Sequence, residues 1–136
     1  MTFVPYAHEP YIQAVTKALD AAGLTVADWG GEDDETRTAW ITLDPAVTSQ
    51  HYPGYDITLT WTEERGWSFG WGEPASDRID WIGDLHTGVL PTPTTVVSVV
   101  RVALEHQRPS VTGPWSRYRY CGDEDDFEQQ LMAYHH

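Results

Sequence analysis

The chain has 136 residues and a mass of 15.4 kDa, which is the size of one ordinary domain. Its 8 Lys and Arg against 21 Asp and Glu give a formal charge of -13, and 40% of its residues are hydrophobic, with 7 Trp and 7 Tyr among the aromatic residues. This composition excludes a wholly disordered chain, and the negative charge argues against direct binding to nucleic acid or to an anionic membrane.

Two further features bear on where the protein acts. No apolar run approaches the roughly 20 residues that cross a bilayer, and residues 1–10 contain neither the basic region nor the apolar stretch of a secretory signal. A single cysteine, Cys121, excludes an intramolecular disulfide framework and a Cys-rich zinc site, and it fits a reducing compartment. We therefore expect a cytoplasmic protein that does not bind a membrane.

The first periodic segment, residues 9–22, predicts a helix. Pro10 suits the first turn of a helix, and Gly23 is a common stop just beyond the C-terminal end. The apolar positions recur at intervals of three and four residues and form one stripe of side chains: Tyr11, Ile12, Val15, Ala18, Leu19 and Ala22.

Four strand candidates follow, at residues 24–29, 37–43, 55–63 and 67–71. The last three alternate apolar with polar side chains, which is the pattern of a strand with one buried face. Glycine, acidic residues and proline mark the connections at residues 30–36 and 44–54 as loops. The predicted buried face carries the side chains of Ile41, Ile57, Leu59, Trp61, Trp67, Phe69 and Trp71.

The turn between the last two strands is predicted from the parity of their side chains. A two-residue loop would place Trp61 opposite Ser68 and mix apolar with polar faces. A three-residue loop over residues 64–66 instead pairs Trp61 with Phe69, and it leaves Gly66 at the left-handed position that such loops favour. We therefore predict the three-residue loop.

Thr92 and Pro93 predict the cap and first turn of a second helix, which ends by Pro109. Its apolar side is rich in valine, which has a low intrinsic helix propensity, so packing against a sheet must stabilise this helix. The apolar positions of this side are Val96, Val97, Val100, Ala103 and Leu104.

The sequence changes character after Pro109. Residues 114–120 are aromatic and basic, and residues 123–134 predict a short third helix whose acidic first turn complements the helix dipole. We divide the chain into a single domain over residues 1–108 and an aromatic and acidic extension over residues 109–136.

The resulting order of elements is α-β-β-β-β-α followed by this tail. The simplest packing is an α+β two-layer sandwich, in which a four-stranded antiparallel meander carries both helices on one face and the C-terminal tail adds a short helix.

Three stretches of sequence carry a resemblance to known proteins. They are the helix Y-I-Q-A-V-T-K-A-L-D-A-A-G, the hairpin T-L-T-W-T-E-E-R-G-W-S-F and the helix entry G-V-L-P-T-P-T-T-V-V. On these stretches the chain resembles, over residues 9–107, a small family of uncharacterised actinobacterial hypothetical proteins with a domain of unknown function. The resemblance implies the architecture above and no catalytic residue. A looser likeness in size, charge and helix-flanked sheet is to the acidic chaperones of secretion systems, and likeness of fold says little about function.

No motif of catalysis or of metal binding stands out. The six histidines lack the spacing of metal ligands, and the chain has no nucleophile elbow, P-loop or dinucleotide fingerprint. Arg119 would favour a reactive thiolate at Cys121, but the acidic residues that follow oppose it. We therefore expect no metal and no cofactor, and we favour a non-enzymatic protein while leaving an enzyme open.

Residues 77–90 carry mixed signals. The alternation around Trp81 favours an edge strand, whereas the interspersed glycines favour irregular structure. This segment contains three ionisable residues, Asp80, Asp84 and His86. It is therefore a candidate site for a small ligand or for an enzyme.

The second face of the predicted sheet is the more informative feature. It displays Trp40 among threonines, with Trp29 expected beside them, and a tryptophan in that setting either covers Gly70 or awaits a partner. The aromatic tail is expected to fold back over this face, within one chain or across a homodimer. The predicted contact residues are Trp40, Thr58, Thr60, Trp115, Tyr118 and Tyr120.

These observations lead to three functional hypotheses. The first is a non-enzymatic module that binds a protein partner through the open sheet face and the aromatic tail. The alternative is an acidic inhibitor or nucleic-acid mimic that binds a basic protein, because of the negative charge and of the acidic runs at residues 32–35 and 123–126. The third is a small-ligand binder or enzyme that uses residues 77–90.

Overall fold

The computed structural model describes residues 7–33, 35–72, 81–105, 118–120, 123 and 125–134, without the side chains of residues 81, 82 and 84. The helices and strands are α1 (Glu9–Ala21), β1 (Val26–Asp33), β2 (Arg37–Leu43), α2 (Pro45–Thr48), β3 (Asp56–Thr62), β4 (Gly66–Gly72), β5 (Trp81–Asp84), α3 (Pro93–Glu105) and α4 (Phe127–Met132).

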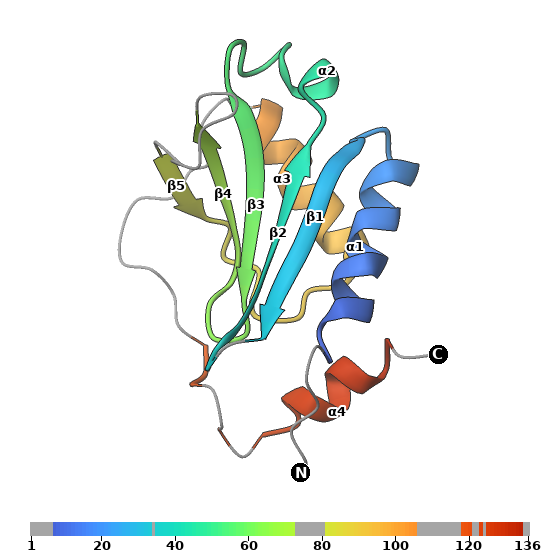
Figure 1. The fold of residues 1–136 in the computed structure, drawn as a ribbon, viewed down its shortest axis with the longest axis vertical. Coiled ribbons are helices and arrows are strands. Elements are labelled where there is room, and N and C mark those ends of the chain that lie inside the picture. Colours follow the sequence, from blue (N-terminus) through green and yellow to red (C-terminus); the bar gives the residue numbers. More distant parts are fainter. Residues whose placement is uncertain are drawn as a thin grey trace.

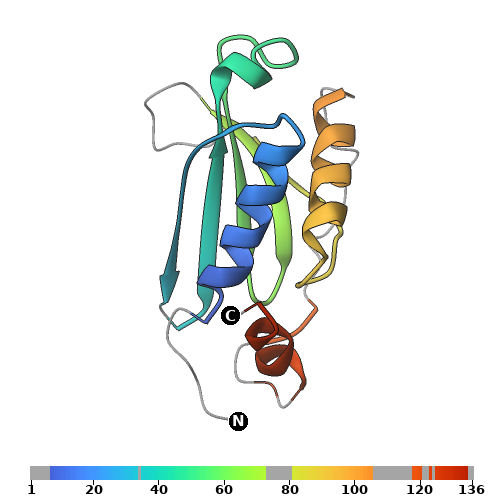
Figure 2. The ribbon, with the colours of Figure 1, turned by 90° about the vertical axis from the view of Figure 1, so that its right-hand side faces the viewer.

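The five strands form one antiparallel sheet in which they lie in sequence order from β1 to β5. The long helices α1 and α3 lie side by side on one face of this sheet, and α4 lies near one of its ends (Figure 1 and Figure 2). The predicted α+β class and the antiparallel meander are therefore confirmed. The additional edge strand, β5, comes from the segment whose signals were mixed.

The face that α1 and α3 cover is the predicted apolar face. Along β2 and β3, buried and half-buried residues alternate strictly, as parity requires when one face is covered. α1 contributes its predicted stripe to the same core, and α3 contributes its valines. The strand residues with no exposed surface are Ile41, Leu43, Ile57, Leu59, Trp61 and Phe69.

β1 continues past its predicted end at Trp29, so the loop predicted from residue 30 is wrong for residues 30–33. Neighbouring rings occupy the space that side chains at Gly30 and Gly31 would need. A Cβ atom at Gly30 would lie 2.9 Å from the ring of Trp40, and one at Gly31 would lie 3.0 Å from Nε2 of His8. The two glycines therefore mark close packing within a strand.

The hairpin between β3 and β4 has a three-residue turn that begins one residue earlier than predicted. Thr62 pairs with Gly66 and Trp61 with Trp67, so the predicted pairing of Trp61 with Phe69 is wrong by two residues. A shift of two residues keeps every side chain on its predicted face. Gly66 adopts the predicted left-handed conformation, with φ +74°.

Two interactions account for the earlier turn. The backbone N–H of Arg65 donates to Oγ1 of Thr62 over 3.0 Å and closes the turn. Glu63, the first turn residue, is buried against Arg37 and accepts a hydrogen bond from its guanidinium. Because the Glu63 side chain points inward to pair with Arg37, Glu63 lies in the turn and not in the strand.

The connecting segments contain more structure than the sequence predicted. Residues 44–54 hold the short helix α2, whose start is capped by the carboxylate of Asp44 accepting from the N–H of Ala46. Tyr52 follows this helix, and its ring is buried at 5.3 Å from that of Trp71. At α3, by contrast, the predicted cap is confirmed: Thr92 Oγ1 accepts from a backbone N–H in the first turn.

The third helix is shorter than predicted, and it packs onto the same core as the rest of the chain. The ring of Phe127 is buried and stacks on Trp61, with 6.4 Å between the ring centroids. Leu131 is buried as well, and Tyr134 meets the edge of Tyr11 at 4.9 Å. The C-terminal helix therefore closes the end of the core next to the hairpin turn.

Two buried arginines tie α4 to the hairpin. Arg37 of β2 binds the carboxylates of Glu63 and Glu128, which raise its pKa against the effect of burial. Arg119 pairs with Asp125 over 2.7 Å and donates to the carbonyl of Glu63. Both guanidinium groups lie over the Phe127 ring, at 5.6 and 4.1 Å from its centroid. Each buried cation thus has a carboxylate and an aromatic partner, as burial of charge requires.

Candidate binding surfaces

The face of the sheet opposite α1 and α3 carries rows of side chains that the strand register fixes. In the middle row, Trp40 lies opposite Gly30 on one side and Thr60 on the other, and Thr60 lies opposite Ser68. The hydroxyls of Thr60 and Ser68 form a hydrogen bond of 2.7 Å. The half-buried threonines of the flanking rows are Thr38 and Thr62 on one side and Thr42 and Thr58 on the other.

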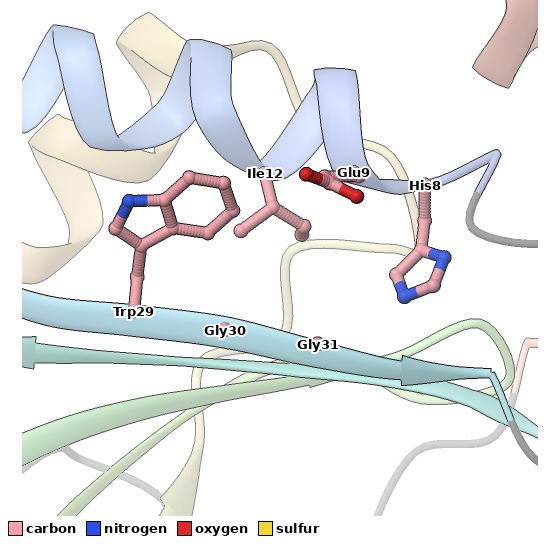
Figure 3. Close-up of a pocket in the computed structure, with 6 residues that line it drawn as sticks. All are labelled: His8, Glu9, Ile12, Trp29, Gly30 and Gly31. Atoms are coloured by element: carbon pink, nitrogen blue, oxygen red, sulfur yellow. The ribbon is translucent and has the colours of Figure 1, made fainter.

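Trp40 is positioned by the glycine that it faces. Its ring covers Gly30 of β1, and the alternative that it covers Gly70 stays a prediction. Trp29 does not share this face, since it pairs with buried Ile41 and its indole points toward α1 (Figure 3). Trp40 is therefore the one tryptophan on the outward side of β1 to β4, half-buried and surrounded by hydroxyl groups.

The charged side chains on this outward side of β1 to β4 are all acidic. Asp28 lies in the row of Thr42, and Glu32 lies in the row of Thr38, at the β1 edge. Asp56 stands at the start of β3. The face is therefore a polar surface with one aromatic ring and an acidic rim.

The aromatic tail lies only partly within the described residues. Trp115 is outside them, so its predicted contact stays a prediction. Tyr118 and Tyr120 are exposed by 44% and 59%, and the N–H of Tyr118 donates to the carbonyl of Glu64 in the hairpin turn. The described part of the tail thus runs beside the turn at the end of the sheet.

The ligand candidates of residues 77–90 lie only partly within the described part of the chain, which includes neither Asp80 nor the side chain of Asp84. The backbone of Asp84 pairs with Ser68 at the end of β5, and His86 is exposed with a φ of +52°, an uncommon conformation for a residue with a side chain. A joint ligand site at these three residues stays a prediction.

A pocket that the sequence did not indicate lies between the start of α1 and β1. It has a volume of about 420 Å³. Figure 3 shows Trp29 and His8 at its two ends, with Ile12 and Glu9 on the helix side and the bare backbone of residues 30 and 31 on the strand side. On the strand side, Gly31 faces α1 without a side chain, and Gly30 contributes backbone alone because its Cβ position points to Trp40 on the other face of the sheet. Only the tertiary structure reveals this juxtaposition.

His8 forms a neutral end wall of this pocket. Its ring is buried and stacks on Trp61 at 5.6 Å, and its Nε2 lies 3.0 Å from the carbonyl of Thr38. Burial lowers the pKa of His8 below its usual value, although the backbone hydrogen bond and the nearby carboxylates of Asp33 and Glu9 oppose that shift. At neutral pH the imidazole is therefore uncharged, with Nε2 donating to the carbonyl.

Other classes of site find no support in the described part of the chain. Within those residues, no three His, Cys, Asp or Glu side chains are grouped so that they could hold a metal ion. No helix in the same part is long and apolar enough to cross a membrane.

A model of one family, described as a family of unknown function (DUF6292), matches residues 11–102. The chain belongs to the DUF6292 family. The DUF6292 region runs from the first turn of α1 into the last turns of α3, so it includes the open sheet face and β1 and leaves out α4. No curated protein and no solved structure is significantly similar to the chain.

Proposed function

We propose that the chain is a non-enzymatic protein-interaction module and that its partner binds the open sheet face around Trp40. One observation carries the proposal: a sheet face without a described helix on it presents a single half-buried tryptophan among hydroxyl groups. Tryptophan at the centre of a surface is the residue type most often found to anchor a protein partner. The paired hydroxyls around it supply hydrogen bonds, as in the polar parts of ordinary interfaces.

The exposed tail residues fit the same interface. Thr60, opposite Trp40, lies two residues, or about 7 Å, from the end of β3 at Thr62, and the turn residue Glu64 that holds Tyr118 follows directly. An interface of ordinary size spans that distance. Trp40, Thr58, Thr60, Tyr118 and Tyr120 therefore remain our proposed contact residues, with Trp115 as a further candidate.

The acidic rim favours the alternative, an acidic inhibitor of a basic protein. Asp28, Glu32 and Asp56 all flank the same face, so both hypotheses use one surface and differ in what supplies the affinity. Screening by salt weakens contacts between exposed charges, whereas it leaves aromatic packing nearly unchanged. We also propose a cytoplasmic location, because the chain has a single cysteine, and an actinobacterial source, because of the three sequence stretches quoted above.

The test compares variants in a pull-down from host lysate. Trp40→Thr removes the ring and extends the threonine rows, and Val102→Thr is the control because Val102 is exposed on α3, away from this face. Losing a central anchor of about 2 kcal/mol weakens binding about 30-fold. A partner kept by wild type and Val102→Thr but lost by Trp40→Thr supports the proposal. Equal capture by both variants contradicts it, and loss at high salt favours the acidic inhibitor.

A further inference from the structure

The pocket between α1 and β1 combines an apolar stretch with one carboxylate. The indole of Trp29 and the buried side chain of Ile12 form an apolar stretch, and the carboxylate of Glu9 lies toward the His8 end (Figure 3). Alkyl stems pack along such apolar surface, and ammonium and guanidinium groups bind both aromatic faces and carboxylates. On the strand side, Gly31 carries no side chain that would narrow the pocket next to His8.

The charges around the pocket favour a cation as well. The carboxylates of Glu9 and Asp33 lie close enough to raise the pKa of His8, and the guanidinium of Arg37 lies close enough to lower it. Arg37 is bound by the carboxylates of Glu63 and Glu128, which offset its charge. With His8 neutral at pH 7, the charged group that lines the pocket is the carboxylate of Glu9, which attracts a cation.

β1 indicates how such a side chain would arrive. It is an edge strand, paired on one side with β2, and Gly31 and Glu32 on it are exposed. An extended segment that adds to a free strand edge places alternate side chains on one face of the sheet. At residues 30 and 31 the side chain on the α1 face would reach the pocket directly.

We propose that the α1–β1 pocket binds a lysine or arginine side chain carried by an extended segment of a partner protein. The stem of that side chain lies against Trp29 and Ile12, and its charged end lies near Glu9. This site is separate from the face around Trp40, so it stands or falls independently of the proposed function.

The test is an NMR titration of the full chain with short blocked peptides. The probe is the pentapeptide Ser-Thr-Lys-Thr-Ser, acetylated and amidated, compared with the same peptide carrying arginine or the uncharged norleucine in place of lysine. We expect the basic peptides to shift the indole N–H of Trp29 and the amides of Gly30 and Gly31, with millimolar affinity. Norleucine should bind about tenfold more weakly.

Matched variants assign the effect to the pocket. Glu9→Gln should weaken binding of the lysine peptide about fivefold, whereas Glu105→Gln, the same charge change at an exposed site on α3, should leave it unchanged. Thr58→Ala, at a proposed contact residue of the open face that is not in contact with β1, should also leave it unchanged, which separates this site from the proposed interface. Amide spectra of each variant establish that it is folded.

Three outcomes overturn the inference. Equal affinity for the lysine and norleucine peptides would show that the pocket does not recognise charge. Equal weakening by Glu9→Gln and Glu105→Gln would show a general effect of net charge. Spermidine binding as tightly as the lysine peptide, with the same shifts, would assign the site to a free amine and remove the protein partner.

Discussion

Substitution of Gly66 tests the packing at the end of the sheet most sharply, because both the backbone conformation and a close neighbour disfavour a side chain there. Its φ is +74°, and a Cβ atom would lie 2.0 Å from the carbonyl oxygen of Gly88. Ordinary contact begins at 3.4 Å, so Gly66→Ala forces the two backbones apart by about 1.4 Å, a displacement that close-packed interiors resist.

The cost of Gly66→Ala follows from these two effects. The left-handed conformation costs an L residue about 1–2 kcal/mol. The displaced segment includes Val89, whose carbonyl accepts a 2.7 Å hydrogen bond from the buried indole of Trp61, and loss of that bond costs about 1–3 kcal/mol. The sum, about 2–5 kcal/mol, lowers the melting temperature of a chain of this size by about 6–15 °C.

Gly54→Ala is the matched control. Gly54 has a φ of +83°, but a Cβ atom there meets nothing within 4 Å, so its cost is the conformational part alone, about 1–2 kcal/mol. Urea unfolding followed by tryptophan fluorescence measures both variants. The free energy of unfolding should fall further for Gly66→Ala than for Gly54→Ala. Equal losses would refute the close approach of Gly88.

Two further predictions concern buried polar groups. Tyr11→Phe should lower the free energy of unfolding by about 2–4 kcal/mol, measured by urea unfolding, because the Tyr11 hydroxyl donates to the carbonyl of Pro91 over 2.6 Å and accepts from the indole of Trp67 over 3.1 Å; an unchanged stability would contradict these bonds. Burial lowers the pKa of His8 below 6.5. Below that pH the unfolded chain therefore binds more protons than the folded chain. The stability that His8 contributes above pH 6.5 is then lost as the pH falls through the pKa of the folded state. NMR titration should place the His8 midpoint below 6.5, and a midpoint above it would contradict the buried, neutral ring.

Parity and capping were the parts of the fold that the sequence predicted well. Alternation along β2 and β3 identified the covered face because one residue of slip would bury threonines and expose Ile57 and Leu59. Thr92 and Pro93 marked the start of α3 because their local chemistry does not depend on tertiary contacts. Trp40 was placed on the open face by the same parity.

The errors arose where tertiary contacts override local signals. Gly30 and Gly31 suggested a loop, but they are strand residues whose side-chain space is taken by Trp40 and His8. The hairpin register depends on Glu63 turning inward to Arg37, a contact across 26 residues of sequence that no local pattern reveals. The α1–β1 pocket was missed for the same reason.

The most direct test of the proposed interface is hydroxyl-radical labelling of the chain, alone and bound to its captured partner. Trp40 and Trp29 report on two different surfaces, since Trp40 lies on the open face and Trp29 lines the pocket beside α1. We expect partner binding to reduce the labelling of Trp40 several-fold, while Met132, exposed by 42% on α4, is labelled as before. Undiminished labelling of Trp40 in the complex would contradict the proposed interface.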